Sequence, residues 1–204
     1  MKINKILKFI FLSIFTILIF SCASKPQNEF PVTCKNLKPV YITDSKKIFL
    51  LHPAYNSSIV DSLQLLQGNF DKQTFSFLIY SQIDSKAISL SLFNDFGSDM
   101  GNVSFNENNV IFDSAFFPAS LPGEYIIADI QNAYYDINAL SQNYKNSKLI
   151  FYSESNEKDN SEKRFIYDDS KLIEEIQISK KGIIIINYLR NYKYELINEN
   201  QTMS

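Results

Sequence analysis

The sequence contains little of the chemistry that metal sites and nucleophilic enzymes need. Its 204 residues include one histidine, two cysteines, five glycines and no tryptophan. The single histidine, His52, has no second imidazole with which to share a zinc site, and a catalytic triad would have to use it as the base. No glycine-rich phosphate loop is present. We therefore expect no metal, no cofactor and no enzymatic activity.

Acidic residues are numerous, but their arrangement does not indicate catalysis. Pairs such as Asp168-Asp169 and Glu174-Glu175 lie in polar stretches, and we interpret them as solvated surface charges. Paired carboxylates hydrolyse glycosides only at defined separations across a cleft, which adjacency in sequence does not supply. A hydrolase would need a cleft that holds His52 or carboxylates with perturbed ionisation, and it is the least favoured of three hypotheses.

The first 21 residues predict a secretory signal peptide. Three lysines precede an apolar run over residues 9–20, which stops at Ser21 and Cys22. A basic start, a short apolar stretch and a small residue before the cut are typical of such peptides. The run is shorter than the ~20 apolar residues of a membrane-spanning helix. Such a segment can be the signal peptide of a lipoprotein, in which Cys22 is modified. In the two alternatives, an ordinary signal peptide and an uncleaved anchor, Cys22 has no role.

Residues 19–22, Ile-Phe-Ser-Cys, resemble a bacterial lipobox. The resemblance implies that Cys22 becomes the first residue of the mature protein and carries acyl chains such as palmitate. Stable anchoring takes more than one acyl chain, which a triacylated cysteine would provide. With Cys22 acylated, Cys34 has no partner for an intramolecular disulfide. Ala23 stands where an acidic residue causes inner-membrane retention in enteric bacteria, so by this analogy we expect the outer membrane, with the domain facing the periplasm.

The charge of the mature chain argues against nucleic acid as a partner. Removal of residues 1–21 takes away three lysines and no acid, which leaves 17 basic and 22 acidic groups. Proteins that bind nucleic acid show basic patches. A chain of net negative charge is not attracted to anionic lipid either, so acyl chains would have to hold it at a membrane.

The mature chain is predicted to consist of a tether, one domain and a tail. Residues 22–45 are polar and interrupted by prolines, and we interpret them as a spacer that lifts the domain off the bilayer. The domain is predicted over residues 46–197, which is long enough to bury a sizeable core. Residues 198–204 are predicted to be a flexible tail, and a monomer is expected.

Strand patterns dominate the predicted domain, because apolar and polar residues alternate with period two. Between the two groups of strands, residues 124–144 have apolar side chains at helical spacing, with Ser120 as the expected N-cap and Pro122 in the first turn. The order of strands, one helix and strands predicts an α+β fold with an antiparallel sheet around the helix. The strands are expected at residues 47–52, 62–67, 71–81, 87–93, 101–105, 110–113, 148–152, 164–167, 172–179, 183–189 and 191–197.

Residues 93–101, Phe-Asn-Asp-Phe-Gly-Ser-Asp-Met-Gly, join two of these strands. Asn, Asp and Gly are turn residues, yet Phe96 stands in the middle of the segment. One interpretation is that Phe96 folds back into the core. The other is that Phe96, together with Met100, projects from the loop as an apolar contact for a partner or for lipid, since exposed apolar groups are costly without one.

This loop carries a resemblance to a known family. Residues 94–98, Asn-Asp-Phe-Gly-Ser between two strands, resemble the Asn-Pro-Leu-Gly-Ser segment of the LolB family of outer-membrane lipoprotein receptors. In that family the leucine of a protruding loop is needed to hand incoming lipoproteins to the membrane. The resemblance implies the same role for Phe96, while Asp95 stands in place of the proline.

The helix region is similar to a family of uncharacterised, LolB-like bacterial lipoproteins, often encoded beside aryl polyene or fatty-acid-type biosynthesis genes. The matching residues are Gly97 with the strand after it, Ser-Leu-Pro at 120–122, and Ile-Ile-Ala-Asp-Ile-Gln at 126–131 with Tyr135 and Leu140. The resemblance covers roughly residues 62–197. It implies a half-open, strongly curved antiparallel sheet, a half-barrel of the LolA/LolB kind, with a helix covering its concave face.

Such a cup would be lined by inward positions of the strands and by one face of the helix. The alternative is that the same side chains fill a close-packed core. The expected lining residues are Phe75, Phe77, Ile79, Leu90, Leu92, Val103, Phe105, Phe112, Ile126, Ile130, Tyr134 and Ile137.

Two functional hypotheses follow. In the first, a membrane-anchored lipoprotein binds acyl chains or lipoprotein clients in the apolar cup, without covalent chemistry, and serves lipoprotein or lipid localisation. In the second, an accessory or structural lipoprotein has a filled core and docks a protein partner. An apolar cavity of at least ~300 Å³ would favour the first, and a dry packed core would favour the second.

Overall fold

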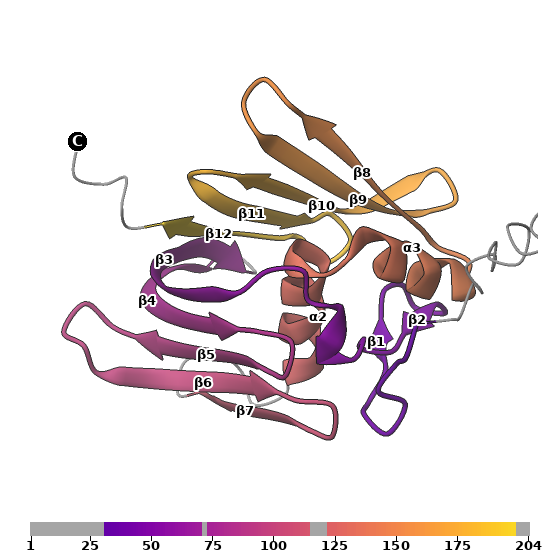
Figure 1. The fold of residues 1–204 in the computed structure, drawn as a ribbon. Coiled ribbons are helices and arrows are strands. Elements are labelled where there is room, and N and C mark those ends of the chain that lie inside the picture. Colours follow the sequence, from indigo (N-terminus) through magenta and orange to yellow (C-terminus); the bar gives the residue numbers. More distant parts are fainter. Residues whose placement is uncertain (1–30, 71–72, 115–121, 199–204) are drawn as a thin grey trace, which may run out of the picture.

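An antiparallel sheet of ten strands, which does not close on itself, is the largest structural unit of the described residues (Figure 1). The computed structural model describes residues 31–70, 73–114 and 122–198. Across the sheet the strands follow the order β7-β6-β5-β4-β3-β12-β11-β10-β9-β8. Their bounds are β3 (Val60–Phe70), β4 (Gln73–Ile83), β5 (Ile88–Phe93), β6 (Asp99–Phe105), β7 (Val110–Ser114), β8 (Ile150–Asn156), β9 (Ser161–Asp168), β10 (Lys171–Ser179), β11 (Gly182–Asn187) and β12 (Tyr192–Asn198).

Two runs of sequential hairpins make the two halves of this sheet. Strands β3 to β7 pair in chain order, and so do strands β8 to β12. The halves join in the middle of the sheet, where β3 pairs with β12. The sheet together with the helices confirms the predicted α+β class.

Two helices follow β7, so the single helix predicted over residues 124–144 is wrong. Helix α2 (Gly123–Tyr134) and helix α3 (Ile137–Asn146) are separated by an extended Tyr135, which forms a bridge with Asn56. The side chain of Asp136 then caps α3 by accepting a hydrogen bond from the backbone N–H of Ala139 at 2.9 Å. The expected N-cap, Ser120, lies outside the described residues.

The sheet curves around α2. The helix packs against β6 and β7 near one edge of the sheet and against β10 near the other. Six strand spacings of about 4.8 Å, or roughly 29 Å, separate β6 from β10 along the sheet. The 12 residues of α2 span only about 18 Å. A bent sheet brings both groups of strands to one helix, so α2 lies on the concave face (Figure 1).

The folded unit begins earlier than the predicted residue 46. Strand β1 (Val40–Tyr41) pairs with β2 (Lys47–Ile48), and a short 3-10 helix, η1 (Pro53–Tyr55), precedes β3. Cys34, Val40 and Ile42 are buried in the main hydrophobic cluster. The tether predicted through residue 45 is therefore shorter, because these three side chains within its predicted range join the core.

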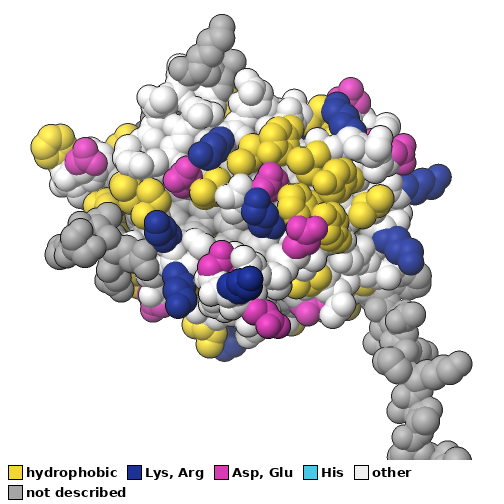
Figure 2. All heavy atoms as spheres, turned by 90° about the horizontal axis from the view of Figure 1, so that it is seen from above, with side chains coloured by type: hydrophobic (Ala, Val, Ile, Leu, Met, Phe, Trp, Pro, Cys, Tyr) yellow, Lys and Arg dark blue, Asp and Glu magenta, His cyan; other side chains and the backbone are white. Residues whose placement is uncertain are grey.

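Side chains alternate between the concave face and the outer face of the sheet. In β5, Ile88, Leu90 and Leu92 are buried, while the serines between them are partly exposed. The outer face carries its own aromatic cluster, in which the Tyr152 ring stacks on Phe165 with centroids 5.1 Å apart. Figure 2 views the molecule from the side of β8 and β9 and shows hydrophobic side chains gathered among charged ones.

Candidate ligand-binding pocket

A pocket lies between the concave face of the sheet and the first two turns of α2. The centre of a water molecule can move through about 110 Å³ of it, and about 800 Å³ of empty space lies within the pocket and its open mouth. The volume of about 110 Å³ is below the ~150 Å³ of an apolar cavity that binds benzene and below the ~300 Å³ expected of a carrier, so the enclosed part can take only a segment of an alkyl chain and the open mouth must take the rest. The walls, almost entirely apolar, are formed by Leu66, Asn69, Phe70, Phe75, Ile79, Leu90, Leu92, Val103, Phe112, Tyr125, Ile126, Asp129, Ile130, Tyr192, Tyr194 and Leu196.

Most of the predicted lining residues lie in these walls. Period-two alternation turns the inward positions of β4, β5, β6 and β7 toward α2, and helical spacing turns one face of α2 back toward them. The residues that the structure brings together as predicted are Phe75, Ile79, Leu90, Leu92, Val103, Phe112, Ile126 and Ile130.

Four predicted lining residues do not reach the pocket. Phe77 stacks on Phe75 with ring centroids 6.2 Å apart and is buried in the core, as is Phe105 at the end of β6. Tyr134 is the last residue of α2, and Ile137 starts α3, so both lie beyond the two helical turns that border the pocket. These positions have the right periodicity, but periodicity does not reveal how far along the strands and helices the pocket extends.

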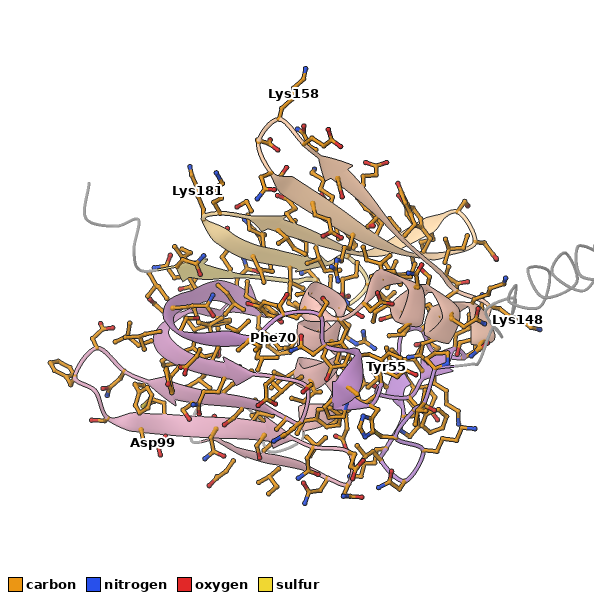
Figure 3. The ribbon with its side chains drawn as sticks, viewed as in Figure 1. Tyr55, Phe70, Asp99, Lys148, Lys158 and Lys181 are labelled. Atoms are coloured by element: carbon orange, nitrogen blue, oxygen red, sulfur yellow. The ribbon has the colours of Figure 1, made fainter. Side chains whose placement is uncertain are left out.

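The wall contributed by the last strand was not predicted. Tyr192, Tyr194 and Leu196 alternate along β12 and face the pocket, and Phe70 enters it from the end of β3 (Figure 3). The alternation at residues 192–196 is visible in the sequence. What the sequence does not reveal is that β12 pairs with β3 in the middle of the sheet.

One acidic side chain stands in the apolar wall. Asp129 of α2 is only 8% exposed, and its Oδ2 accepts hydrogen bonds from the Tyr192 hydroxyl at 2.8 Å and the Tyr194 hydroxyl at 3.1 Å. Burial, followed by the nearby charge of Glu174, raises the pKa of the Asp129 carboxyl well above its usual range. The two tyrosine hydroxyls and Arg190 act in the opposite direction. Folding therefore favours the neutral acid at this position.

A second buried carboxyl, Glu174, belongs to a polar network behind this wall. Its two oxygens accept hydrogen bonds from the side-chain amides of Asn132 at 3.0 Å and Asn187 at 2.9 Å, and the Tyr144 hydroxyl donates to Asn132. The interpretation of Glu174 as a solvated charge is wrong, because a bulge between Leu172 and Glu174 turns this residue to the concave face. Burial raises the pKa of Glu174, and its amide partners oppose the rise.

The turn between β5 and β6 holds Phe96 away from the protein. The side-chain Oδ1 of Asn94 accepts hydrogen bonds from the backbone N–H groups of Phe96 at 3.0 Å and Ser98 at 2.9 Å, and Gly97 takes a positive φ of 75°. Phe96 is 94% exposed at the tip, so it does not fold back into the core. Met100, its expected companion, lies in β6, where it is half-buried and packs against the core.

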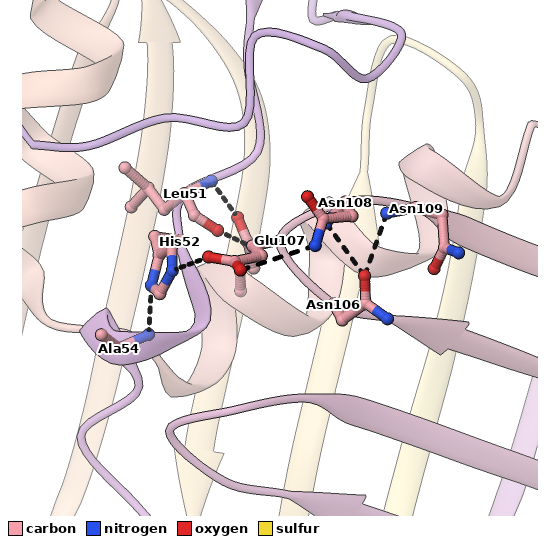
Figure 4. Close-up of polar contacts among 8 residues, drawn as sticks. Leu51, His52, Ala54, Asn106, Glu107, Asn108 and Asn109 are labelled. Atoms are coloured by element: carbon pink, nitrogen blue, oxygen red, sulfur yellow. Dashed lines mark hydrogen bonds and ion pairs between the residues drawn. The ribbon is translucent and has the colours of Figure 1, made fainter.

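His52 has a structural position at the start of η1. Its Nδ1 accepts a hydrogen bond from the backbone N–H of Ala54 at 3.1 Å, and its Nε2 lies 2.6 Å from Glu107 Oε2 (Figure 4). The two residues therefore tie η1 to the turn between β6 and β7. Among the described residues, no cluster of histidine, cysteine and carboxylate side chains could hold a metal ion.

Cys22 lies outside the described residues. Within residues 31–70, 73–114 and 122–198, no helix has the length and apolar character needed to span a bilayer. Cys34 is buried as a free thiol.

The comparisons with known proteins identify a family but no activity. A model of the family described as "Protein of unknown function (DUF3261)" matches residues 61–200. This stretch is more than half of the chain and contains every residue that lines the pocket. No curated protein matches the chain.

Proposed function

We propose that this chain, which belongs to the DUF3261 family, is a membrane-anchored lipoprotein that binds acyl chains or lipoprotein clients in its apolar pocket. It would serve the localisation of lipids or lipoproteins in the cell envelope, without bond-breaking chemistry. The observation that carries the proposal is the partly open, apolar pocket under α2.

The pocket suits a hydrocarbon chain for energetic reasons. Its side chains present carbon atoms to a space that is open to solvent, and each methylene group that leaves water contributes about 0.8 kcal/mol. Aromatic side chains from β3, β4, β7 and β12 surround the space, namely Phe70, Phe75, Phe112, Tyr192 and Tyr194. A chain that enters from the mouth would cover this surface without any catalytic group.

The β5–β6 turn supports a membrane-facing role. Phe96 is 94% exposed and stands at the tip of a hydrogen-bonded turn. A bent, open sheet with a helix on its concave face and an apolar residue on a protruding turn is the organisation that the LolB resemblance implies. We therefore assign Phe96 to the contact with lipid or client, and Cys22 to the anchor.

A pair of tryptophan substitutions tests the pocket. Ile126 lines the pocket, whereas Ile111 is exposed on β7, outside the pocket. The full chain, reconstituted into phosphatidylcholine nanodiscs, is irradiated with a C12 alcohol that carries a diazirine in its chain. We expect Ile126→Trp to lower labelling of pocket peptides about tenfold, equivalent to ~1.4 kcal/mol, and Ile111→Trp to leave it unchanged. Equal labelling of both variants would contradict binding in the pocket.

A pair of glutamate substitutions tests the turn. Phe96→Glu places a charge at the tip, and Ile59→Glu does the same at another highly exposed apolar residue, 86% exposed. Transfer of the bound C12 probe from the protein to liposomes should slow in Phe96→Glu and not in Ile59→Glu. The same transfer rate in both variants and the parent chain would remove the contact role of Phe96.

The anchor and location are tested separately. Mass spectrometry of the mature N-terminus should find a Cys22 that carries acyl chains, and membrane fractionation should place the protein in the outer membrane. An unmodified N-terminus, or a protein retained in the inner membrane, would contradict these two parts of the proposal.

The outer face favours the second hypothesis, a docking lipoprotein. Tyr152 on β8 is 38% exposed and stacks on Phe165 and Tyr167 of β9, which gives β8 and β9 an aromatic outer surface. If this surface is the functional one, Tyr152→Ser should abolish capture of a partner while C12 labelling of the pocket stays as in the parent chain.

A further inference from the structure

The buried carboxyl of Asp129 has one oxygen that forms no hydrogen bond with any of the described residues. Both tyrosine hydroxyls bond to Oδ2, and within the described residues Oδ1 has no hydrogen-bond partner. Oδ1 is also not fully enclosed, since Tyr135 Oη is the one enclosed side-chain atom without a partner among the residues described. Asp129 lines the pocket, so its Oδ1 is available to a ligand there.

We propose that the Asp129 carboxyl selects the polar end of the bound chain, and that the pocket takes single-chain amphiphiles ending in an uncharged hydroxyl-type group in preference to ionised ones. This inference rests on the proposed binding of acyl chains in the same pocket. The ligand class is a long-chain alcohol, or a carboxylic acid in its protonated form. Its O–H group would bond to Asp129 Oδ1 while the chain lies along the apolar walls.

The charges around Asp129 explain the preference for a neutral end. A ligand carboxylate or phosphate would lose part of its hydration against the largely buried Asp129 carboxyl and would lie near a second carboxyl, Glu174. An uncharged O–H group avoids this cost and can either donate to Oδ1 or accept from it. The titratable and charged groups that face Asp129 are Glu174 on β10, Arg190 between β11 and β12, Tyr192 and Tyr194 on β12, and Tyr144 on α3. Burial raises the pKa of Asp129, which is consistent with a site that prefers uncharged partners.

Asn69 is the other polar residue of the lining, but it is exposed at the end of β3. An exposed amide can bond to water whether or not a ligand is present, so it selects weakly. The Oδ1 atom of the buried Asp129, by contrast, has no hydrogen-bond partner among the described residues, so it depends more on the ligand. The discrimination therefore depends on one residue and can be removed by one substitution.

The test compares two probes that differ only in their polar end. The full chain in phosphatidylcholine nanodiscs is labelled at pH 8 with a diazirine-bearing C12 alcohol and with the corresponding C12 acid, which is ionised at this pH in water. We expect the alcohol to label pocket peptides at least about tenfold more than the acid, the ratio that corresponds to one lost or unfavourable hydrogen bond.

Two matched variants separate the carboxyl from general charge effects. Asp129→Asn keeps an oxygen for the tyrosine hydroxyls and presents an N–H group that a carboxylate can accept from, so labelling by the acid should rise and the ratio should fall toward one. Glu124→Gln makes the same carboxyl-to-amide change in the first turn of α2, outside the pocket, and should keep the parent ratio.

The outcomes distinguish this inference from the proposed function. If both probes label the parent chain equally, or if Asp129→Asn keeps the parent ratio, Asp129 does not select the polar end, although chain binding stands. If neither probe labels the pocket, the inference and the proposed function both fail. The comparison of the two probes in the parent chain needs no variant. Equal labelling by the alcohol and the acid would therefore overturn the preference even if Asp129→Asn does not fold.

Discussion

Replacement of Leu92 by alanine tests whether the pocket is an open hollow or part of a packed core. Leu92 is 4% exposed and forms part of the pocket wall. Leu51 is 0% exposed and lies outside that wall, in an extended segment that bridges to Thr33. Since both are leucines in extended backbone, Leu51→Ala is a matched control.

The two truncations remove the same atoms but leave different spaces. At Leu51 the space is enclosed, and enclosed cavities cost about 24 cal/mol per Å³ in addition to the lost transfer free energy. We expect Leu51→Ala to lower the free energy of unfolding by about 3–5 kcal/mol. At Leu92 the space merges with the pocket, where the leucine already lacks packed neighbours on one side, so we expect a loss of about 2–3 kcal/mol.

Urea denaturation of the full chain in detergent, followed by circular dichroism and extrapolated linearly to water, measures both losses. The denaturant slope must stay the same in the two variants for the comparison to hold. A loss at Leu92 that equals or exceeds the loss at Leu51 would mean that Leu92 is packed on all sides. That result would refute the pocket and favour a filled core.

Three further predictions concern a thiol, a glycine and a helix cap. Burial, with a smaller effect of the Glu107 charge, raises the pKa of Cys34 from 9.0 to about 11, so at pH 8 iodoacetamide should alkylate its peptide about 100-fold more slowly in the folded than in the unfolded chain. Because folding favours the neutral thiol, its contribution to stability is complete below pH 9 and is lost as the pH rises to about 11; equal alkylation rates would contradict the burial. Gly182 has φ +140°, and an added Cβ would lie 1.9 Å from the Leu196 carbonyl oxygen, so Gly182→Ala should cost more than ~2 kcal/mol in thermal unfolding. Gly97→Ala, with open space around its Cβ, should cost about 1–2 kcal/mol, and equal costs would show that the clash at Gly182 is relieved. Asp136→Ala removes the cap of α3 and should cost about 1 kcal/mol, which Asp136→Ser should largely restore in the same assay.

The faces of the sheet could be predicted from the sequence, but its strand order could not. Leu90 and Leu92 alternate with serines, and this local pattern decides which side of β5 is buried. Nothing local to β3 indicates that its neighbour is β12, because that pairing depends on the return of the last strand to the middle of the sheet. The break between α2 and α3 was missed for a similar reason, since apolar spacing continues through Tyr135, and the bridge to Asn56 comes from a distant segment.

The residues of the candidate site also divide into those that a local sequence pattern predicts and those whose position depends on distant segments. Strand alternation and helical spacing predicted eight of its wall residues, among them Leu90 and Ile126. In the sequence Asp129 was noted only as part of the helix segment at residues 126–131, and its place in the pocket wall depends on tyrosines from β12. The turn at residues 94–98 was recognised from its composition. Whether Phe96 points outward depends on the bonds that Asn94 makes, which composition does not specify.

The pairing of β3 with β12 also bears on how the molecule assembles. Each half of the sheet can form from neighbouring hairpins, but the join requires residues from opposite ends of the domain, and such long-range contacts slow folding. Until Tyr192–Asn198 arrives, β3 and β11 would each present an unpaired backbone edge of the kind that recruits other chains. A truncation that removes β12 would therefore leave two exposed strand edges in the centre of the sheet and promote aggregation.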